Sequence, residues 1–241
     1  MEKIKCWKCE TEVIRKLDDK SQFIIEYMQK HPHKIIKERY KDIETKKLKR
    51  AFCEECKKEN EDEYKSDLDE YLRLKNKLMI NRAIRKFENQ PVDIYKYKDA
   101  INVVAEYAEK NREKFMSSDE MLAAIVLIHH RIQTKVQYKI KNHQVDFLLP
   151  GLKVALEIDG YMHGHSQLSD SRRDIEMRSE LGDDWEVVRI PTKYLEQNAI
   201  KLPDAIRVIK EEKQKIRKEN AGIIPEWYSK REKIHYKRLT K

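Results

Sequence analysis

Residues 134–160, TKVQYKIKNHQVDFLLPGLKVALEIDG, contain the strongest strand pattern in the chain. Apolar and polar side chains alternate along three segments, 134–140, 144–149 and 152–159, and alternation with a period of two residues is typical of half-buried strands. Pro150-Gly151, between the second and third segments, is a turn signal. The stretch therefore predicts three consecutive strands, of which the last two form a hairpin.

Helical patterns precede and follow these strands. A strongly apolar helix is expected from Ser117, and a charged helix around 170–181 that ends at Gly182. A fourth strand is expected over 185–190, followed by a last helix over 203–218. The order helix, three strands, helix, strand, helix predicts an α/β (α+β) fold, in which a mixed β-sheet is flanked by helices.

The chain divides into three segments by composition. Residues 1–58 begin and end with a CxxC pair, and residues 59–115 are dense in charge with sparse apolar side chains. Two helices, over 59–87 and 97–114, are expected in this second segment, which predicts a solvated arm or linker. Residues 116–241 contain the strand pattern and a basic tail, so we expect the mixed-sheet domain there.

The charge of the chain favours a polyanionic partner. Its 241 residues carry a formal net charge of +9, and 39% of them are charged. Nucleic acid is the commonest partner for such a balance, although lysine-rich helices that only keep a protein in solution give the same composition. No apolar run approaches the ~18 residues of a membrane span, and the N-terminus lacks the apolar stretch of a signal peptide. We therefore expect an intracellular protein without a membrane partner.

The four cysteines form two CxxC pairs, Cys6–Cys9 and Cys53–Cys56. In a reducing compartment such pairs more often bind a metal than form disulfides, and four thiolates suit one tetrahedral zinc ion. The pairs are 43 residues apart, which is longer than the usual ribbon spacing of ~15–20, so a helical insertion around 23–40 is expected between them. The pairs resemble treble-clef or ribbon-type zinc modules, and four thiolates predict a structural zinc with no open coordination site.

Two alternatives to this zinc site stay open. The cysteines can be ordinary buried thiols or redox pairs. His31 or His33 can replace one cysteine as a ligand, although a surface position is the more usual one for such histidines.

Three acidic residues share one face of the predicted hairpin: Asp146, Glu157 and Asp159. If the hairpin closes around Pro150-Gly151, Asp146 faces Ala155 and has Glu157 as its diagonal neighbour, within about 7–8 Å. Carboxylate oxygens on rigid strands suit Mg²⁺ or Mn²⁺. The hairpin therefore predicts a site for a divalent metal.

Residues after the third strand supply further groups that phosphodiester hydrolysis requires. His163 and His165 follow the strand end and can act as base or acid, or complete the metal coordination. Asp170, Arg172 and Arg173 lie on the following predicted helix, and Arg173 is a candidate phosphate clamp. Together with the hairpin carboxylates, these side chains predict a nuclease site.

Two of the acidic residues also have ordinary structural interpretations. Ser117-x-x-Glu120 is a capping box at a helix start, so Glu120 can be a cap, a catalytic residue, or both. Asp159 precedes Gly160 and can be a turn residue. Asp146 lies on an otherwise apolar strand, where a carboxylate without a partner or metal is costly, so the functional interpretation is favoured there.

These residues resemble the PD-(D/E)XK nuclease superfamily, particularly its branch near the very-short-patch-repair endonucleases. The pattern of that branch is a helix glutamate, a VDF-like aspartate, an E-I-D-G strand end, a histidine, and a D-x-x-R-D helix before a final strand. The matching residues are Glu120, Asp146, Glu157-Ile158-Asp159-Gly160, His163 and Asp170-x-x-Arg173-Asp174. The order also resembles that of the EDxHD homing endonucleases, and the match covers about residues 117–200.

The resemblance implies a restriction-endonuclease-like core that cuts DNA with a divalent metal. One position departs from the pattern, because Asp159 stands where the standard motif has a lysine. That departure favours the histidine-using branch of the superfamily, or a core that binds nucleic acid without cutting it.

The leading hypothesis is a metal-dependent DNA endonuclease, such as a homing or other site-specific nuclease. It would act on double-stranded DNA as a cytoplasmic protein, associated with the nucleoid or encoded by a phage in a bacterial host, and a homodimer is a candidate state. One alternative is an RNA nuclease or mismatch nickase that uses the same residues. Another is a non-catalytic zinc-containing protein that binds nucleic acid.

Overall fold

The computed structural model describes residues 2–6, 8–15, 53–59, 61–159, 167–220 and 224. The chain forms two compact units, Met1–Lys75 and Asn76–Lys241, and each is described by itself. The helix expected around residues 23–40 lies outside the described residues.

The first unit contains a small hairpin and a short helix. Strand β1 (Glu2–Lys5) pairs antiparallel with β2 (Glu12–Arg15), and the first CxxC pair lies in the connection between them. Helix α3 (Glu54–Glu59) contains the second pair at its start. Helix α4 (Glu61–Glu88) begins in this unit and ends in the second unit. Four-residue strands leave too few positions for alternation to be seen, so this hairpin has no clear signal in the sequence.

The second unit is built on the predicted four-stranded mixed sheet, whose order is β3-β4-β5-β6. Its strands are β3 (Lys135–Ile140), β4 (His143–Leu149), β5 (Val154–Asp159) and β6 (Glu186–Pro191). The first three strands are antiparallel neighbours, and β6 is parallel to β5. A 3-10 turn, η2 (Pro150–Leu152), connects β4 to β5, so the predicted turn between them is confirmed.

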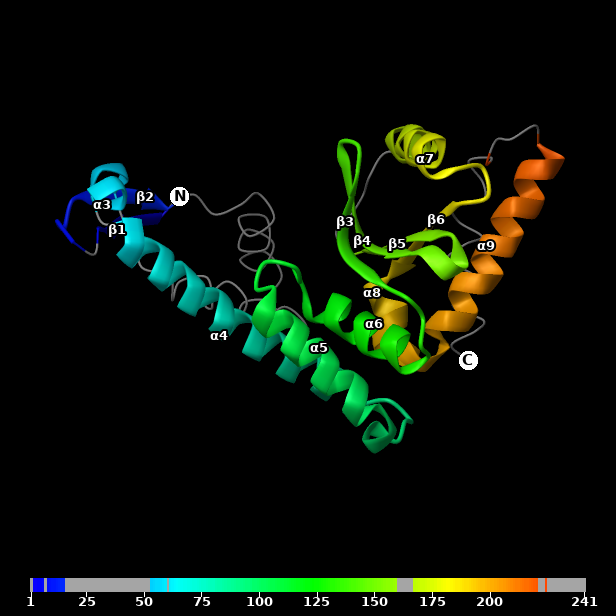
Figure 1. The fold of residues 1–241 in the computed structure, drawn as a ribbon, viewed down its shortest axis with the longest axis horizontal. Helices are drawn as coiled ribbons and strands as arrows, with labels where there is room; N and C mark the ends of the chain where they lie inside the picture. Colours follow the sequence, from blue (N-terminus) through cyan, green and yellow to red (C-terminus); the bar gives the residue numbers. More distant parts are fainter. Residues whose placement is uncertain are drawn as a thin grey trace, which may run out of the picture. The chain divides into compact units, whose positions relative to one another are not determined.

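Helices cover both faces of this sheet (Figure 1). Helix α7 (Gln167–Leu181) lies on one face and forms part of the crossover that a parallel strand pair requires. Helices α6 (Ser118–His129) and α8 (Thr192–Asn198) lie on the other face, and α9 (Leu202–Glu219) packs against α6 and β6. The predicted mixed sheet flanked by helices is therefore confirmed.

Alternating side chains give the sheet two hydrophobic cores. On β5, Leu156 faces the larger core, which includes most of α6 and the buried residues of α8 and α9. Its neighbour Ala155 faces the smaller core beneath α7, where Met177 and Val187 are buried. The alternation of β5 is the pattern from which the sequence predicted this strand.

The stretch from residue 76 to residue 115 also packs into the larger core. The 3-10 helix η1 (Ile94–Tyr97) and α5 (Lys98–Lys110) contribute buried residues, and Phe87 and Phe115 are fully buried. This packing differs from the solvated arm that the sparse apolar residues indicated. Alanines at 83, 100 and 108 are buried there, because small side chains let helices approach closely.

Gln90 anchors the end of α4 to the region where α8 meets η3 (Ala199–Lys201). Its side chain donates to the carbonyl of Leu195 at 3.2 Å and accepts from the backbone N–H of Ala199 at 2.6 Å.

Among the described residues, no helix combines the length and the apolar character that a bilayer span requires.

The central strand supplies a test of this architecture. Leu156 is fully buried in β5, so Leu156→Ala should lower the free energy of unfolding by about 2–5 kcal/mol. Leu78 is half-exposed on α4, and Leu78→Ala should change stability by about 0.5 kcal/mol or less. Chemical denaturation of both variants measures the difference. Equal losses would contradict the burial of β5.

Candidate functional site

The β4–β5 hairpin has a different register from the one the sequence suggested. Asp146 does not face Ala155, because Ala155 pairs with Leu148 and Leu156 pairs with Phe147. The physical reason is the length of the connection: η2 is followed by Lys153 in the left-handed conformation (φ 51°), so Leu149 and Val154 close the ladder. The ladder ends at the pair of Phe147 and Leu156, and Asp146 and Glu157 are the next residues on the two strands.

The carboxylate of Asp146 lies where the β4–β5 ladder ends. Its Oδ2 accepts from the backbone N–H of Ile158 at 2.7 Å, and its Oδ1 accepts from the side-chain amide of Gln137 at 3.2 Å. Burial raises the pKa of Asp146 to about 6. The carboxylates of Glu157 and Asp159 add to this rise in pKa, whereas the hydrogen bond from Ile158 opposes it. Asp146 is therefore a buried acid close to two others.

Glu120 forms the predicted capping box and also belongs to the group of buried acids. As a capping residue it accepts from Ser117 Oγ at 2.9 Å and from the Met116 backbone N–H at 3.0 Å, while Ser117 Oγ accepts from the Glu120 backbone N–H at 3.1 Å. As a member of the acidic group it accepts from Gln137 at 3.0 Å. Burial and the carboxylate of Asp146 raise the pKa of Glu120 to about 7.

Gln137 connects these two acids and was not identified from the sequence. Its Nε2 donates to both Glu120 Oε2 and Asp146 Oδ1, and its backbone has a φ of 48°, which is costly for a residue other than glycine. In the β3–β4 ladder Val136 pairs with Phe147 and Tyr138 pairs with Val145, but Gln137 between them is not paired. Nothing in the alternating strand pattern distinguishes Gln137 from a solvent-facing residue, so no sequence signal would have revealed this contact.

The carboxylate of Glu157 is held by two arginines. Arg173, on α7, donates to Oε1 and also to the carbonyl of Gln144, the latter at 2.9 Å. Arg189, on β6, donates to Oε2 at 3.0 Å and forms two further bonds with Asp174 at 3.1 and 2.5 Å. Burial raises the pKa of Glu157, whereas the two guanidinium groups lower it.

Arg189 is the second residue that the sequence analysis did not identify as part of the site. It is the register partner of Glu157 across the parallel β5–β6 pair. The pattern of β6 shows a charged residue in an apolar strand, which is a weak signal for a buried ion pair. Identifying its partner requires the sheet order.

The remaining candidates are described only in part. Asp159 is half-buried at the end of β5. His163 and His165 lie outside the described residues, as do the side chains of Asp170 and Arg172, whose backbones belong to α7. The described part of the site therefore consists of Glu120, Asp146, Glu157, Asp159 and Arg173, with Gln137, Asp174 and Arg189 in contact with them.

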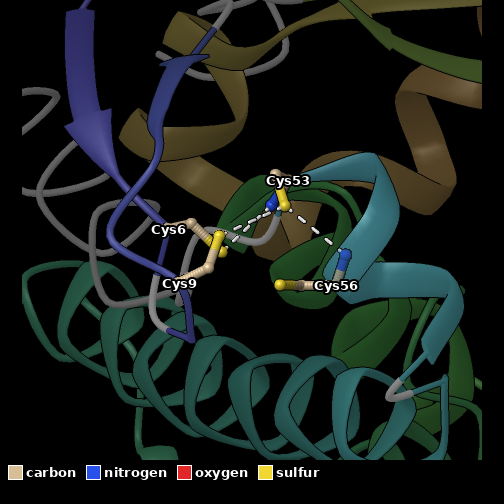
Figure 2. A group of neighbouring side chains, drawn as sticks. All are labelled: Cys6, Cys9, Cys53 and Cys56. Carbon is tan, nitrogen blue, oxygen red and sulfur yellow. Dashed lines mark hydrogen bonds between the residues drawn. The ribbon is translucent and has the colours of Figure 1, made fainter.

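The four cysteines form a separate cluster in the first unit (Figure 2). Their Sγ atoms all lie within 4.8 Å of one another, and the two pairs face each other from the β1–β2 connection and the start of α3. The sulfurs of Cys9 and Cys53 are 3.6 Å apart. Four sulfurs at these distances can hold one metal ion such as zinc.

Backbone N–H groups also favour a metal ion at this cluster. The N–H of Cys53 donates to Cys6 Sγ at 3.3 Å, and that of Cys56 donates to Cys53 Sγ at 3.4 Å. Hydrogen bonds from the backbone of Cys9 and of Cys53 lower the pKa of Cys6 to about 6. The pKa of Cys56 is raised, because its thiol lies against those of Cys9 and Cys53. A cation would relieve this crowding of sulfurs.

Within the described ranges, the cysteines are the one group of three or more Cys, His, Asp or Glu side chains whose ligand atoms converge in this way. The sheet carboxylates are close to one another but are held by Gln137 and the two arginines. Comparison with protein-family models, curated proteins and solved structures found no match for this chain.

The raised pKa of Glu120 predicts a pH-dependent effect of Glu120→Gln. The glutamine can keep an oxygen acceptor for Met116 and Gln137, with its amide towards Ser117 Oγ. Between pH 4.5, the usual pKa, and about 7, the folded wild type binds more protons than the unfolded chain, so its stability falls as the pH rises. A glutamine does not titrate, so Glu120→Gln does not lose stability in this way. The free energy of unfolding of the variant relative to the wild type should therefore rise by about 3 kcal/mol from pH 4.5 to pH 8.

Urea denaturation of the zinc-loaded protein without added Mg²⁺ or Mn²⁺, across this pH range, measures the difference. Glu106→Gln, on the exposed face of α5, is the matched control and should leave the profile unchanged. An effect of Glu120→Gln that is the same at every pH would exclude a raised pKa.

Proposed function

We propose that this chain is a DNA endonuclease that depends on a divalent metal, with its active site where the first half of β4 lies beside the end of β5. The observation that carries this proposal is the electrostatic coupling of Glu120, Asp146 and Glu157. Gln137 donates to the first two carboxylates, and burial together with the charge of Glu157 raises the pKa of Asp146. Buried acids that raise the pKa of one another are typical of sites that receive a cation.

The order of elements also supports the proposal. The nuclease pattern has its glutamate on a helix, its aspartate on a strand, its E-I-D-G motif at the next strand end, and its D-x-x-R-D motif on a helix before the last strand. The corresponding residues lie on α6, β4, β5 and α7, and β6 follows. These residues span 54 positions of the sequence, from Glu120 to Asp174.

The chemistry of the oxygen ligands fits Mg²⁺ or Mn²⁺. Asp146 and Glu157 would hold the ion, with Asp159 beside them, and the ion would supply an activated water and stabilise negative charge on the phosphorus. Arg173 would bind a phosphate oxygen, and His163 or His165 would move the proton of the attacking water or the leaving oxygen. Glu120 and Gln137 would keep Asp146 oriented through their shared hydrogen bonds.

The net charge of +9 supports a nucleic acid as the substrate, and double-stranded DNA is the form that the resemblance implies. One observation favours the non-catalytic alternative. Glu157 already has two guanidinium partners, so its charge is balanced without a metal. In a protein that binds nucleic acid without cutting it, Glu157 would stay paired with both arginines and would never bind a metal ion.

We propose further that the cysteine cluster binds one structural zinc ion. Four sulfurs leave no coordination position for a substrate, and the segment they join is short and polar. The metal would then supply folding free energy to the first unit.

Zinc content tests this second site. The wild type should contain about one zinc ion per chain, and Cys6→Ser or Cys56→Ser should lose most of it, because a hydroxyl is a poor zinc ligand. Thr11→Val, next to the cluster, is the control and should retain the metal. Mass spectrometry of the metal content and thiol titration before and after chelation measure these results. A wild type whose four cysteines all react without a chelator would contradict the site.

DNA cleavage tests the nuclease proposal. The wild type should nick or linearise plasmid or its native genomic DNA with Mg²⁺ or Mn²⁺ and be inactive in EDTA. Asp146→Asn should lower cleavage by about a hundredfold or more, because it removes a metal ligand but can keep an acceptor for the Ile158 N–H. Asp99→Asn, on the exposed side of α5, should cleave as the wild type does.

RNA and mismatched duplexes belong in the same assay, because they separate DNA endonuclease from RNA nuclease and mismatch nickase. If wild type and Asp146→Asn bind DNA equally and neither cleaves any substrate, the nuclease hypothesis fails. The non-catalytic protein that binds nucleic acid would then be the supported function.

A further inference from the structure

The two arginines that hold Glu157 differ in how firmly they are fixed. Arg189 belongs to the sheet, is the register partner of Glu157, and forms two bonds with Asp174. Its side chain is 15% exposed. An arginine with two carboxylate partners in a fixed strand register is part of the framework.

Arg173 reaches Glu157 from α7 and is more exposed, at 27% of its side chain. Glu157 is the carboxylate that it binds, and its other described hydrogen bond goes to the carbonyl of Gln144. Among the described residues, its release would therefore cost one ion pair and one neutral acceptor, while Arg189 would still hold Oε2 of Glu157.

We propose that Arg173 is a latch that a divalent cation displaces: it neutralises Glu157 when no metal is bound, and metal binding frees it to bind a phosphate of the nucleic acid. This inference rests on the proposed function, because it assumes that Glu157 is a metal ligand. It adds a coupling between the two ligands, in which metal binding makes Arg173 available to a phosphate.

Competition for one carboxylate is the physical reason for the exchange. Arg189 holds Oε2 of Glu157, so Oε1, which accepts from Arg173, is the oxygen through which a cation would reach Glu157. A cation on Oε1 would take the place of the Arg173 guanidinium and repel it. Arg173 is the arginine that can turn towards solvent, where a phosphate is a new partner for its planar fork.

The latch makes metal and nucleic acid bind cooperatively. Each ligand favours the state in which Arg173 has left Glu157, so each must strengthen the binding of the other by the same factor. In the absence of DNA, however, Arg173 competes with the metal for Glu157. Arg173 therefore weakens metal binding when DNA is absent and links metal binding to DNA binding when DNA is present. A residue that only braced Glu157 would not produce both effects.

The first measurement is calorimetric titration of the zinc-loaded protein with Mn²⁺, without DNA. Arg173→Gln should bind Mn²⁺ about fivefold more tightly than the wild type, because a competitor has been removed. A bracing role predicts weaker binding instead. Arg173→Lys keeps the charge and should bind as the wild type does. Arg207→Gln, on the exposed side of α9, controls for the loss of one positive charge.

The second measurement is DNA binding by fluorescence anisotropy with and without Ca²⁺. Ca²⁺ should strengthen DNA binding by about tenfold in the wild type and in Arg207→Gln, but hardly at all in Arg173→Gln. Unchanged or weaker Mn²⁺ binding by Arg173→Gln would overturn the latch, and so would an undiminished Ca²⁺ effect.

Asp146→Asn separates this inference from the proposed function. Wild type that binds Mn²⁺ no better than Asp146→Asn does would refute the metal site itself. Wild type that binds Mn²⁺ through Asp146, with no gain in Arg173→Gln, would refute the latch alone.

Discussion

The parallel pairing of β6 with β5 is the constraint on which the site depends. A parallel neighbour cannot be reached by a tight turn, so the chain crosses the sheet through α7 before β6 begins. This crossing brings Arg173 and Asp174 of α7 over the strand that carries Glu157, and the register places Arg189 beside it. An antiparallel β6 would give Glu157 neither partner.

The buried acids are stabilised in two different ways. Glu157 has cationic partners, whereas Glu120 and Asp146 have neutral donors: the Gln137 amide and backbone N–H groups. Neutral donors offset less of the cost of burying a charge, so the pKa values of these two acids rise to about 7 and about 6. Gln137 remains between them despite its left-handed backbone, and such retained strain is common at functional sites.

Local patterns predicted the elements but not their contacts. Alternation and the Pro150-Gly151 turn identified the three strands, and Ser117 marked the start of α6. The register was wrong, because it depends on the left-handed Lys153, which no local pattern indicates. Gln137 and Arg189 were missed, since their roles arise from residues far away in the sequence. The cysteine cluster was predicted because CxxC spacing fixes two sulfurs locally, and one metal site needs only two such pairs.

Anomalous diffraction from crystals soaked in Mn²⁺ would locate a metal ion bound at the sheet carboxylates. We expect an anomalous peak in contact with the carboxylates of Asp146 and Glu157, with the Arg173 guanidinium displaced from Glu157. No peak at these carboxylates, with Glu157 still bound by both Arg173 and Arg189, would contradict it.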